Sequence, residues 1–303
     1  MVDFAKLKKN RKSNLANLQQ KMEETASGKQ KSNRDDRFWS PTVDKAGNGY
    51  AVLRFLPPQE GDLPWVRLWS HGFKGEKTGQ WYIENSRTTI EEDDPVAEYN
   101  SELWNSGVEE DKEQARKQKR RLHFISNVLI VKDDANPELE GKVMLFKYGK
   151  KIFEKLNAAM NPEFEDEEAM DPFDMWEGAN FRLKIRKYEG YRNYDKSDFA
   201  EPSAVADDDK AIKAIWEQTH DIQALVAPDQ FKSYAELKAR LERVLNLKSK
   251  TRIVEEANET EEETMDAPEE KEKPARKEKE ASLLEGDGDD DLENLLESLG
   301  EED

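Results

Sequence analysis

The last 49 residues of the chain are too acidic and too poor in apolar side chains to form part of a hydrophobic core. Residues 255–303 hold 22 acidic and 5 basic side chains, and residues 281–303 hold 10 acidic and no basic ones. Such a segment buries too little apolar surface to offset the entropy of ordering its backbone. The sequence therefore predicts a disordered acidic tail at 255–303 and confines the fold to the residues before it.

The rest of the chain is nearly neutral and carries two basic segments. The formal charge of the 303 residues is −19, and residues 255–303 account for −17 of it. Residues 1–34 hold 9 basic and 3 acidic side chains, and residues 112–121 (KEQARKQKRR) hold 6 basic and one acidic. This segregation predicts a basic N-terminal arm at 1–25, a polar linker at 26–37 and a folded core at 38–254.

Short apolar runs bounded by Gly, Pro, Asn or Asp predict a core made mainly of β-strands. The runs lie at 50–56, 65–69, 80–83, 123–131, 142–146 and 180–188. Helical spacing of apolar residues predicts helices at 150–160 and 208–226, and a capping box at 233–236 predicts a third helix over the residues that follow. The mixture favours a small antiparallel core, a barrel more than a sandwich, with flanking helices.

The sequence contains no recognisable catalytic constellation. It has no cysteine, and His71, His123 and His220 are far apart and show no metal-ligand spacing. It also has no phosphate-binding loop, nucleophile elbow or dinucleotide fingerprint, so we do not expect an enzyme. No apolar run approaches the roughly 18 residues of a membrane span and the start is no secretory leader, which predicts a cytoplasmic protein without membrane contact.

Cations and aromatic residues follow one another in two polar segments. Residues 116–121 run directly into Phe124, and Tyr191 and Tyr194 lie beside Arg192 in the segment GYRNYDKSDF. Lysine and arginine neutralise phosphates, and flat rings accept unstacked bases, so this pattern predicts a groove for a single-stranded nucleic acid. Stacking and phosphate contacts alone leave the choice between DNA and RNA open.

Two other classes of function remain as alternatives. The first is an acidic scaffold or chaperone-like interaction protein that binds no nucleic acid and uses its tail to bind basic proteins. The second is an enzyme that acts on nucleic acid, such as a nuclease, but no carboxylate–metal motif in the sequence supports it.

Five collinear segments resemble a known family. They read KAGNGYAVLRFLP (45–57), HGFKGEKTGQWYIE (71–84), NVLIVKDDANPELEGKV (127–143), GKKIFEKLNA (149–158) and WEGANFRLKI (176–185). Their order and spacing resemble the single-stranded DNA-binding (helix-destabilising) proteins of T-even-type bacteriophages, over most of residues 8–254. The resemblance implies an OB-type five-stranded β-barrel with inserted lobes and a groove for single-stranded DNA.

The same resemblance implies a cooperative, sequence-non-specific protein that coats and protects single strands in phage DNA replication, recombination and repair, in the cytoplasm of the host cell. It implies head-to-tail filaments formed through the basic arm and recruitment of replication and recombination proteins by the acidic tail. The residues that match the family's DNA-contacting positions are Arg54, Trp104, Lys119, Arg120, Arg121, Phe124, Phe146, Tyr191 and Tyr194. The residues that match its cooperativity motif are Lys8, Lys9, Arg11, Lys12 and Ser13.

The chain departs from the resemblance at a metal site. Well-known members of the family hold zinc with one His and three Cys; here His71 matches the His, but Ser86, Asp94 and Ala97 stand at the Cys positions. One imidazole and one carboxylate cannot make a closed tetrahedral site, so we expect no zinc and no other cofactor. We expect packing of aromatic and apolar side chains to hold residues 71–110 instead, namely Trp81, Tyr82, Ile83 and Tyr99. Two groove rings of the family are also absent, because Ala115 and Ile125 occupy their positions.

Overall fold

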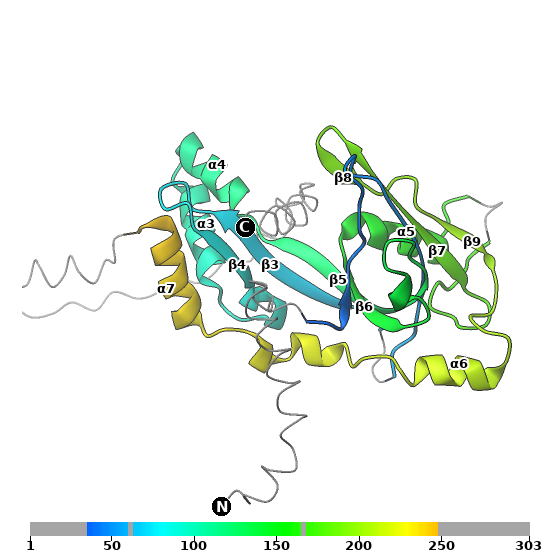
Figure 1. Cartoon of the computed structure of the whole chain (residues 1–303). Coiled ribbons are helices and arrows are strands. Elements are labelled where there is room, and N and C mark those ends of the chain that lie inside the picture. The colour runs from blue at the N-terminus through cyan, green and yellow to red at the C-terminus, as the bar shows by residue number, and fades with distance from the viewer. Residues whose placement is uncertain (1–34, 60–62, 165–167, 248–303) are drawn as a thin grey trace, which may run out of the picture. The chain divides into compact units, whose positions relative to one another are not determined.

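The computed structural model describes residues 35–59, 63–164 and 168–247 (Figure 1). The expected arm at 1–25, residues 26–34 of the linker, residues 248–254 at the end of the expected core and the tail at 255–303 lie outside the described residues. None of the described helices combines the length and the apolar character needed to cross a membrane.

The described residues form a large sheet with several helices, as the sequence predicted in outline. The strands are β1 (Phe38–Trp39), β2 (Gly49–Phe55), β3 (Val66–Lys74), β4 (Trp81–Asn85), β5 (Arg121–Lys132), β6 (Val143–Tyr148), β7 (Ala179–Tyr188), β8 (Tyr191–Asn193) and β9 (Asp198–Pro202). The α-helices are α3 (Pro95–Asn105), α4 (Glu109–Lys117), α5 (Lys150–Met160), α6 (Asp209–Trp216) and α7 (Tyr234–Leu245). Short 3₁₀ helices lie at η1 (Arg87–Ile90), η2 (Pro137–Leu139), η3 (Gln223–Val226) and η4 (Pro228–Gln230).

Strand β5 organises the sheet because it is long enough to pair with three neighbours. Its residues 121–125 pair with β3, residues 124–129 with β6 and residues 128–132 with β2, all antiparallel. Strand β2 continues the sheet to β7, which also pairs with β8 and β9, while β3 continues it to β4. These pairings do not close into a ring among the described residues, so the sheet is not a barrel and the expected OB-type five-stranded barrel is not confirmed.

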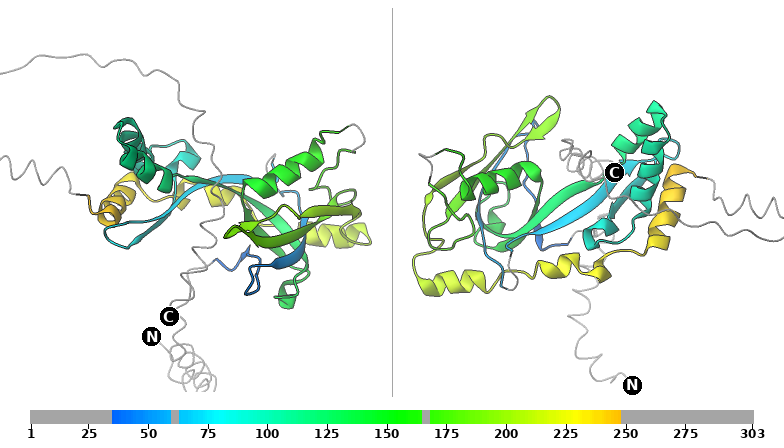
Figure 2. Two further views of the ribbon diagram at one scale, coloured as in Figure 1. Left: turned by 90° about the horizontal axis from the view of Figure 1, so that it is seen from above. Right: turned by 180° about the vertical axis from the view of Figure 1, so that it is seen from behind.

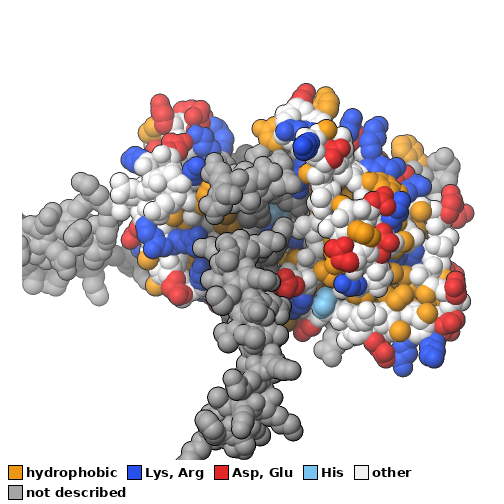
Figure 3. Space-filling view, in the orientation of Figure 1, with side chains coloured by type: hydrophobic (Ala, Val, Ile, Leu, Met, Phe, Trp, Pro, Cys, Tyr) orange, Lys and Arg blue, Asp and Glu red, His pale blue; other side chains and the backbone are white. Residues whose placement is uncertain are grey.

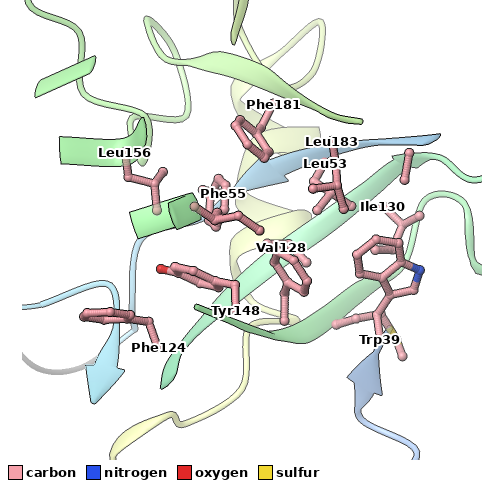
Figure 4. Close-up of a cluster of buried hydrophobic side chains, with 14 of the residues drawn as sticks. Trp39, Leu53, Phe55, Phe124, Val128, Ile130, Tyr148, Leu156, Phe181 and Leu183 are labelled. Atoms are coloured by element: carbon pink, nitrogen blue, oxygen red, sulfur yellow. The ribbon is translucent and has the colours of Figure 1, made fainter. Parts of the chain in front are cut away.

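Most of the large buried side chains belong to one core between β2, β5, β6, β7 and α5. The ring of Phe55 lies at its centre, 5.7 Å from that of Tyr148 and 5.8 Å from that of Phe181, and both pairs meet edge to face (Figure 4). Such aromatic pairs contribute about 0.5–1.5 kcal/mol each beyond the area they bury. This main core holds β2, β6, β7 and α5 against β5.

A second core joins β3 and β4 to helix α7. Phe73 and Tyr82 stack at 5.0 Å, and the apolar face of α7 covers them with Leu237, Leu241, Val244 and Leu245. The helix begins where the sequence predicts, because Ser233 and Glu236 form the capping box. Figures 1 and 2 show α7 beside the β3–β4 hairpin in each view. Because β3 pairs with β5, these two strands connect the main core with the second core, and we call them the bridging strands.

One predicted helix is wrong in its length. The apolar spacing predicted a helix over 208–226, but α6 ends at Trp216 and only the short 3₁₀ helix η3 follows. The buried side chain of Asn127 explains the break: its amide donates to the His220 carbonyl (2.9 Å) and accepts from the His220 N–H (2.8 Å). Both backbone groups of His220 are therefore committed to a tertiary contact and are lost to a continuous helix.

Candidate nucleic-acid interface

A cationic and aromatic strip lies on one face of the bridging strands β3 and β5. Successive residues of a strand point to opposite faces, so Arg67, Trp69 and His71 of β3 share a face. The register places Phe124 opposite Arg67 and Leu122 opposite Trp69, so these two residues of β5 lie on the same face. Arg67 is exposed and Trp69 is partly exposed.

Arg120, immediately before β5, completes this strip. Its guanidinium carbon lies 4.3 Å from the centre of the Trp69 ring, a cation–π contact of about 0.5–1 kcal/mol at an exposed site and more where water is excluded. Asp94 attracts the same guanidinium, although partial burial still lowers the pKa of Arg120 below its usual value. We call Arg67, Trp69 and Arg120 the bridge strip.

The three cations that the sequence grouped together do not share one face. Arg121 lies opposite Ser70 and therefore on the face of the ladder away from Trp69. There it is close to His123, since burial together with the charges of Lys147 and Arg121 holds the pKa of His123 well below its usual value. Lys119 lies between α4 and β5 and is partly exposed. Arg120 stacks on the Trp69 ring of β3.

The five matched aromatic residues fall into two groups. Phe124, Phe146 and Tyr194 are buried in the main core, and Phe124 stacks face to face on Phe153 of α5 with ring centres 3.9 Å apart. In this structure their ring faces are covered by protein. Trp104 on α3 and Tyr191 at the β7–β8 turn are 36% and 52% exposed, so these two present surface to a ligand. Their expected contacts with DNA stay a prediction.

Arg54, expected at the interface, lies in the interior. It is fully buried, and its Nη2 donates to the carbonyls of Asp174 and Ser203, each at 2.8 Å. Gly178 packs so closely against it that an added Cβ would lie 3.1 Å from Nη2. In this structure Arg54 therefore ties β2 to the segments around residues 174 and 203, and its side chain does not reach the surface.

A second row of cations lies on the outward face of β7 and is paired with carboxylates. Arg182 binds Asp198 through both carboxylate oxygens, and Lys184 reaches the same carboxylate at 3.0 Å. Arg186 binds Asp195 in the same bidentate way. Figure 3 shows Lys and Arg side chains gathered over the region of β7 and β8 with acidic side chains between them. These pairs compete with phosphate for the cations, so this row is a weaker candidate than the bridge strip.

Part of the bridge strip has a local signal in the sequence. Arg67 and Trp69 are two residues apart in a predicted strand, and this spacing alone puts a cation and a ring on the same face. What the spacing does not give is the partner, because Arg120 is 51 residues from Trp69 in the chain and meets it only through the pairing of β3 with β5.

The residues at the zinc positions of the T-even-type resemblance come together around one carboxylate. The Nε2 of His71 lies 3.3 Å from Oδ1 of Asp94, and the Ser86 hydroxyl donates to Oδ2 at 3.0 Å. The carboxylate also accepts the N–H of Arg87, Val96 and Ala97, the last two as the N-cap of α3. Burial pushes the pKa of Asp94 upward, but the hydrogen bond and attraction of His71 and the backbone N–H groups outweigh it and lower the pKa to about 2.

This set of residues does not fit a zinc ion. Structural zinc requires four ligands in a tetrahedron, usually thiolates and imidazoles. Here the Ala97 side chain has no ligating atom, and the neutral hydroxyl of Ser86 already donates a hydrogen bond to Asp94. Both carboxylate oxygens of Asp94 accept hydrogen bonds. Within the described residues, no group of three or more His, Cys, Asp or Glu side chains is placed to hold a metal ion.

Comparisons with known proteins agree with one another. Residues 47–245 match the family model described as gp32 DNA binding protein like. The chain is 40% identical over 222 residues to a single-stranded DNA-binding protein of Enterobacteria phage T2, covering 71% of this chain and 72% of the relative. It is 38% identical over 243 residues to a single-stranded DNA-binding protein of Enterobacteria phage T4, covering 78% and 79%. The family model spans most of the described fold, including the bridge strip and the Asp94 cluster, and the chain belongs to the gp32-like family of DNA-binding proteins.

Proposed function

We propose that the chain binds single-stranded DNA without sequence preference and that the bridge strip is part of the binding surface. The observation that carries this proposal is the guanidinium of Arg120 lying over the partly exposed ring of Trp69, with Arg67 exposed two residues away on the same face. Cations follow the phosphates while a ring accepts a base, whatever its identity, because every base has a π-face. The relatives in phages T2 and T4, named single-stranded DNA-binding proteins, support it.

This chemistry favours single strands over duplexes. In a duplex the bases are stacked on one another, so a ring on the protein surface gains nothing until the strand is opened. The phosphate contacts are available in both forms and therefore set only the general affinity. Preference for the single strand is expected to come from Trp69 and from the exposed rings of Trp104 and Tyr191.

Two finer parts of the proposed function rest on the charged ends of the chain. The basic arm, with Lys8, Lys9, Arg11, Lys12 and Ser13, makes binding cooperative by docking on a neighbouring protomer, and this head-to-tail contact extends into a filament. The acidic tail competes with DNA for the basic surface and, once displaced, recruits replication and recombination proteins. The role is to coat and protect single strands in phage replication, recombination and repair, without catalysis.

A salt titration with a labelled oligo-dT strand tests the proposal. The logarithm of the affinity should fall linearly with the logarithm of salt concentration, with a slope of about −0.7 for each phosphate neutralised. The variants Arg67→Ser and Arg120→Ser should each make the slope shallower by about that amount. A matched control is Lys213→Ser on α6, an exposed lysine paired with Glu217, which should leave the slope unchanged.

The outcomes separate the proposed function from its rival. An acidic scaffold that binds no nucleic acid would give no complex with oligo-dT at any salt concentration. Equal affinity for oligo-dT and for a duplex of the same length would show that phosphates alone are bound and that the rings have no role. Unchanged slopes for both Arg67→Ser and Arg120→Ser would place the DNA elsewhere on the surface.

A further inference from the structure

One buried carboxylate connects four segments in the group of elements around β3 and β4. Asp94 is 2% exposed, and its two oxygens contact side-chain atoms of β3 and of the residue after β4, and backbone N–H groups of η1 and α3. These contacts come from His71, Ser86, Arg87, Val96 and Ala97. No other described carboxylate that is as deeply buried makes contacts to so many separate elements, since Asp133, the other buried one, contacts mainly its own loop and Trp39.

His71 extends the cluster to a fifth segment. Its Nδ1 lies 3.1 Å from the carbonyl oxygen of Gln118, the C-cap of α4, and the side chain of Asn100 on α3 donates to the same carbonyl at 3.0 Å. Gln118 is two residues before Arg120, so the cluster also positions the chain that leads to the bridge strip. The contacts thus converge from strands and helices that are far apart in sequence, as ligands converge on a structural metal ion.

We propose that the carboxylate of Asp94 is a built-in structural centre that holds β3, the end of β4, the start of α3 and the end of α4 together without a metal ion. The sequence led us to expect that packing of Trp81, Tyr82, Ile83 and Tyr99 would take over this task. That packing is present in part: Tyr82 packs with Phe73 of β3 and Val96 of α3 in the second core and Tyr99 packs against this core, while Trp81 and Ile83 are only partly buried. The Asp94 carboxylate adds polar contacts between the same segments.

The first test removes the charge at the centre and keeps the shape. In Asp94→Asn the amide oxygen still caps α3, but the amide NH2 faces the Arg87 N–H, so two donors oppose each other. We expect the Tm to fall by roughly 5–10 °C. The matched control is Asp93→Asn, the same change one residue earlier at an exposed side chain, which should leave the Tm unchanged.

A milder variant keeps the proposal testable if Asp94→Asn fails to fold. Ser86→Ala removes one donor to Oδ2 of Asp94 and leaves the other contacts in place, so a smaller fall in Tm is expected. Hydrogen exchange in this variant should speed up at the amides of Arg87, Val96 and Ala97 more than at amides of β7, which lies in the main core. If both Asp94→Asn and Ser86→Ala melt with the wild type, the cluster is not a structural centre and the proposal fails.

The second test asks whether the fold is stable without a metal ion, and whether positions 71, 86, 94 and 97 converge closely enough to form a metal site. Wild-type protein dialysed against a chelator should keep its Tm, and added ZnCl2 should not raise it. The triple variant Ser86→Cys, Asp94→Cys, Ala97→Cys places three thiols beside His71 and should bind about one zinc per chain with a rise in Tm. Adding His71→Ala to the triple variant should weaken that binding.

Two results of the second test would overturn the proposal. Tightly bound, stoichiometric zinc in the wild-type protein would show that a metal is the centre after all. A folded triple variant that binds no zinc would show that the four positions do not converge as described. These measurements use metal content, Tm and hydrogen exchange and need no DNA, so they stand apart from the proposed DNA binding.

Discussion

Replacing Trp69 by alanine should weaken the binding of single-stranded DNA more than the same change at Trp176, an exposed ring outside the bridge strip. The variant removes a partly exposed ring on β3 that carries Arg120 at 4.3 Å. Stacking of one base on a protein ring contributes about 1–3 kcal/mol, which corresponds to a loss of roughly 5- to 150-fold in affinity at 25 °C. Because Arg120 also loses its stacking partner and becomes less ordered, we expect the upper half of that range.

The assay is fluorescence anisotropy of a labelled oligo-dT at a fixed, moderate salt concentration. Trp69→Phe keeps a flat ring and should recover most of the affinity. Trp176→Ala is the matched control, since Trp176 is 55% exposed and its indole N–H donates to Asp209, away from the bridge strip. Thermal melting of each variant checks that the fold is retained. If folded Trp69→Ala binds as tightly as Trp176→Ala, no base stacks on Trp69 and the argument from the bridge strip is wrong.

Three further predictions concern other parts of the chain. Burial lowers the pKa of His123 in the folded protein, so below about pH 6.5 the unfolded chain binds a proton that the folded chain does not. The free energy of unfolding should therefore fall as the pH drops below about 6.5, by up to about 1.4 kcal/mol per pH unit. Urea titrations at several pH values should show a weaker pH dependence of this free energy for His123→Gln. An equal pH dependence in both proteins would remove His123 as the cause. Deleting residues 281–303 should tighten oligo-dT binding at low salt and have less effect at high salt, because the competition of the acidic tail is screened; an unchanged affinity at low salt would count against it. Arg54→Met should lower the Tm, since carbonyls of Asp174 and Ser203 lose their donor, but leave the oligo-dT affinity of the folded protein unchanged; a selective loss of affinity would restore Arg54 to the interface.

Strands and caps were predictable because their signals are local. The six expected strand runs correspond to β2 to β7, and the capping box at Ser233 and Glu236 marks the start of α7. Helices α3 and α4 were not predicted, although Asp94 followed by Pro95 is a recognisable N-cap and first turn. The candidate interface was predictable only in part: Arg120 was among the expected residues and lies in the bridge strip, whereas Arg67 and Trp69 were expected only as part of the sequence around a strand.

The sequence by itself determined the family, the mainly β character and the separation of the charge, because collinear motifs, alternation and composition are properties of neighbouring residues. Only the tertiary structure decided which rings face solvent and which cations are available. The residues beside Phe124 and Phe146 in the sequence do not distinguish these rings from solvent-exposed rings that could stack on a base. In the fold, Phe153 of α5 covers Phe124, and the main core encloses both rings. Exposure depends on contacts between residues far apart in the chain, such as the pairing of β3 with β5, and no local pattern specifies those contacts.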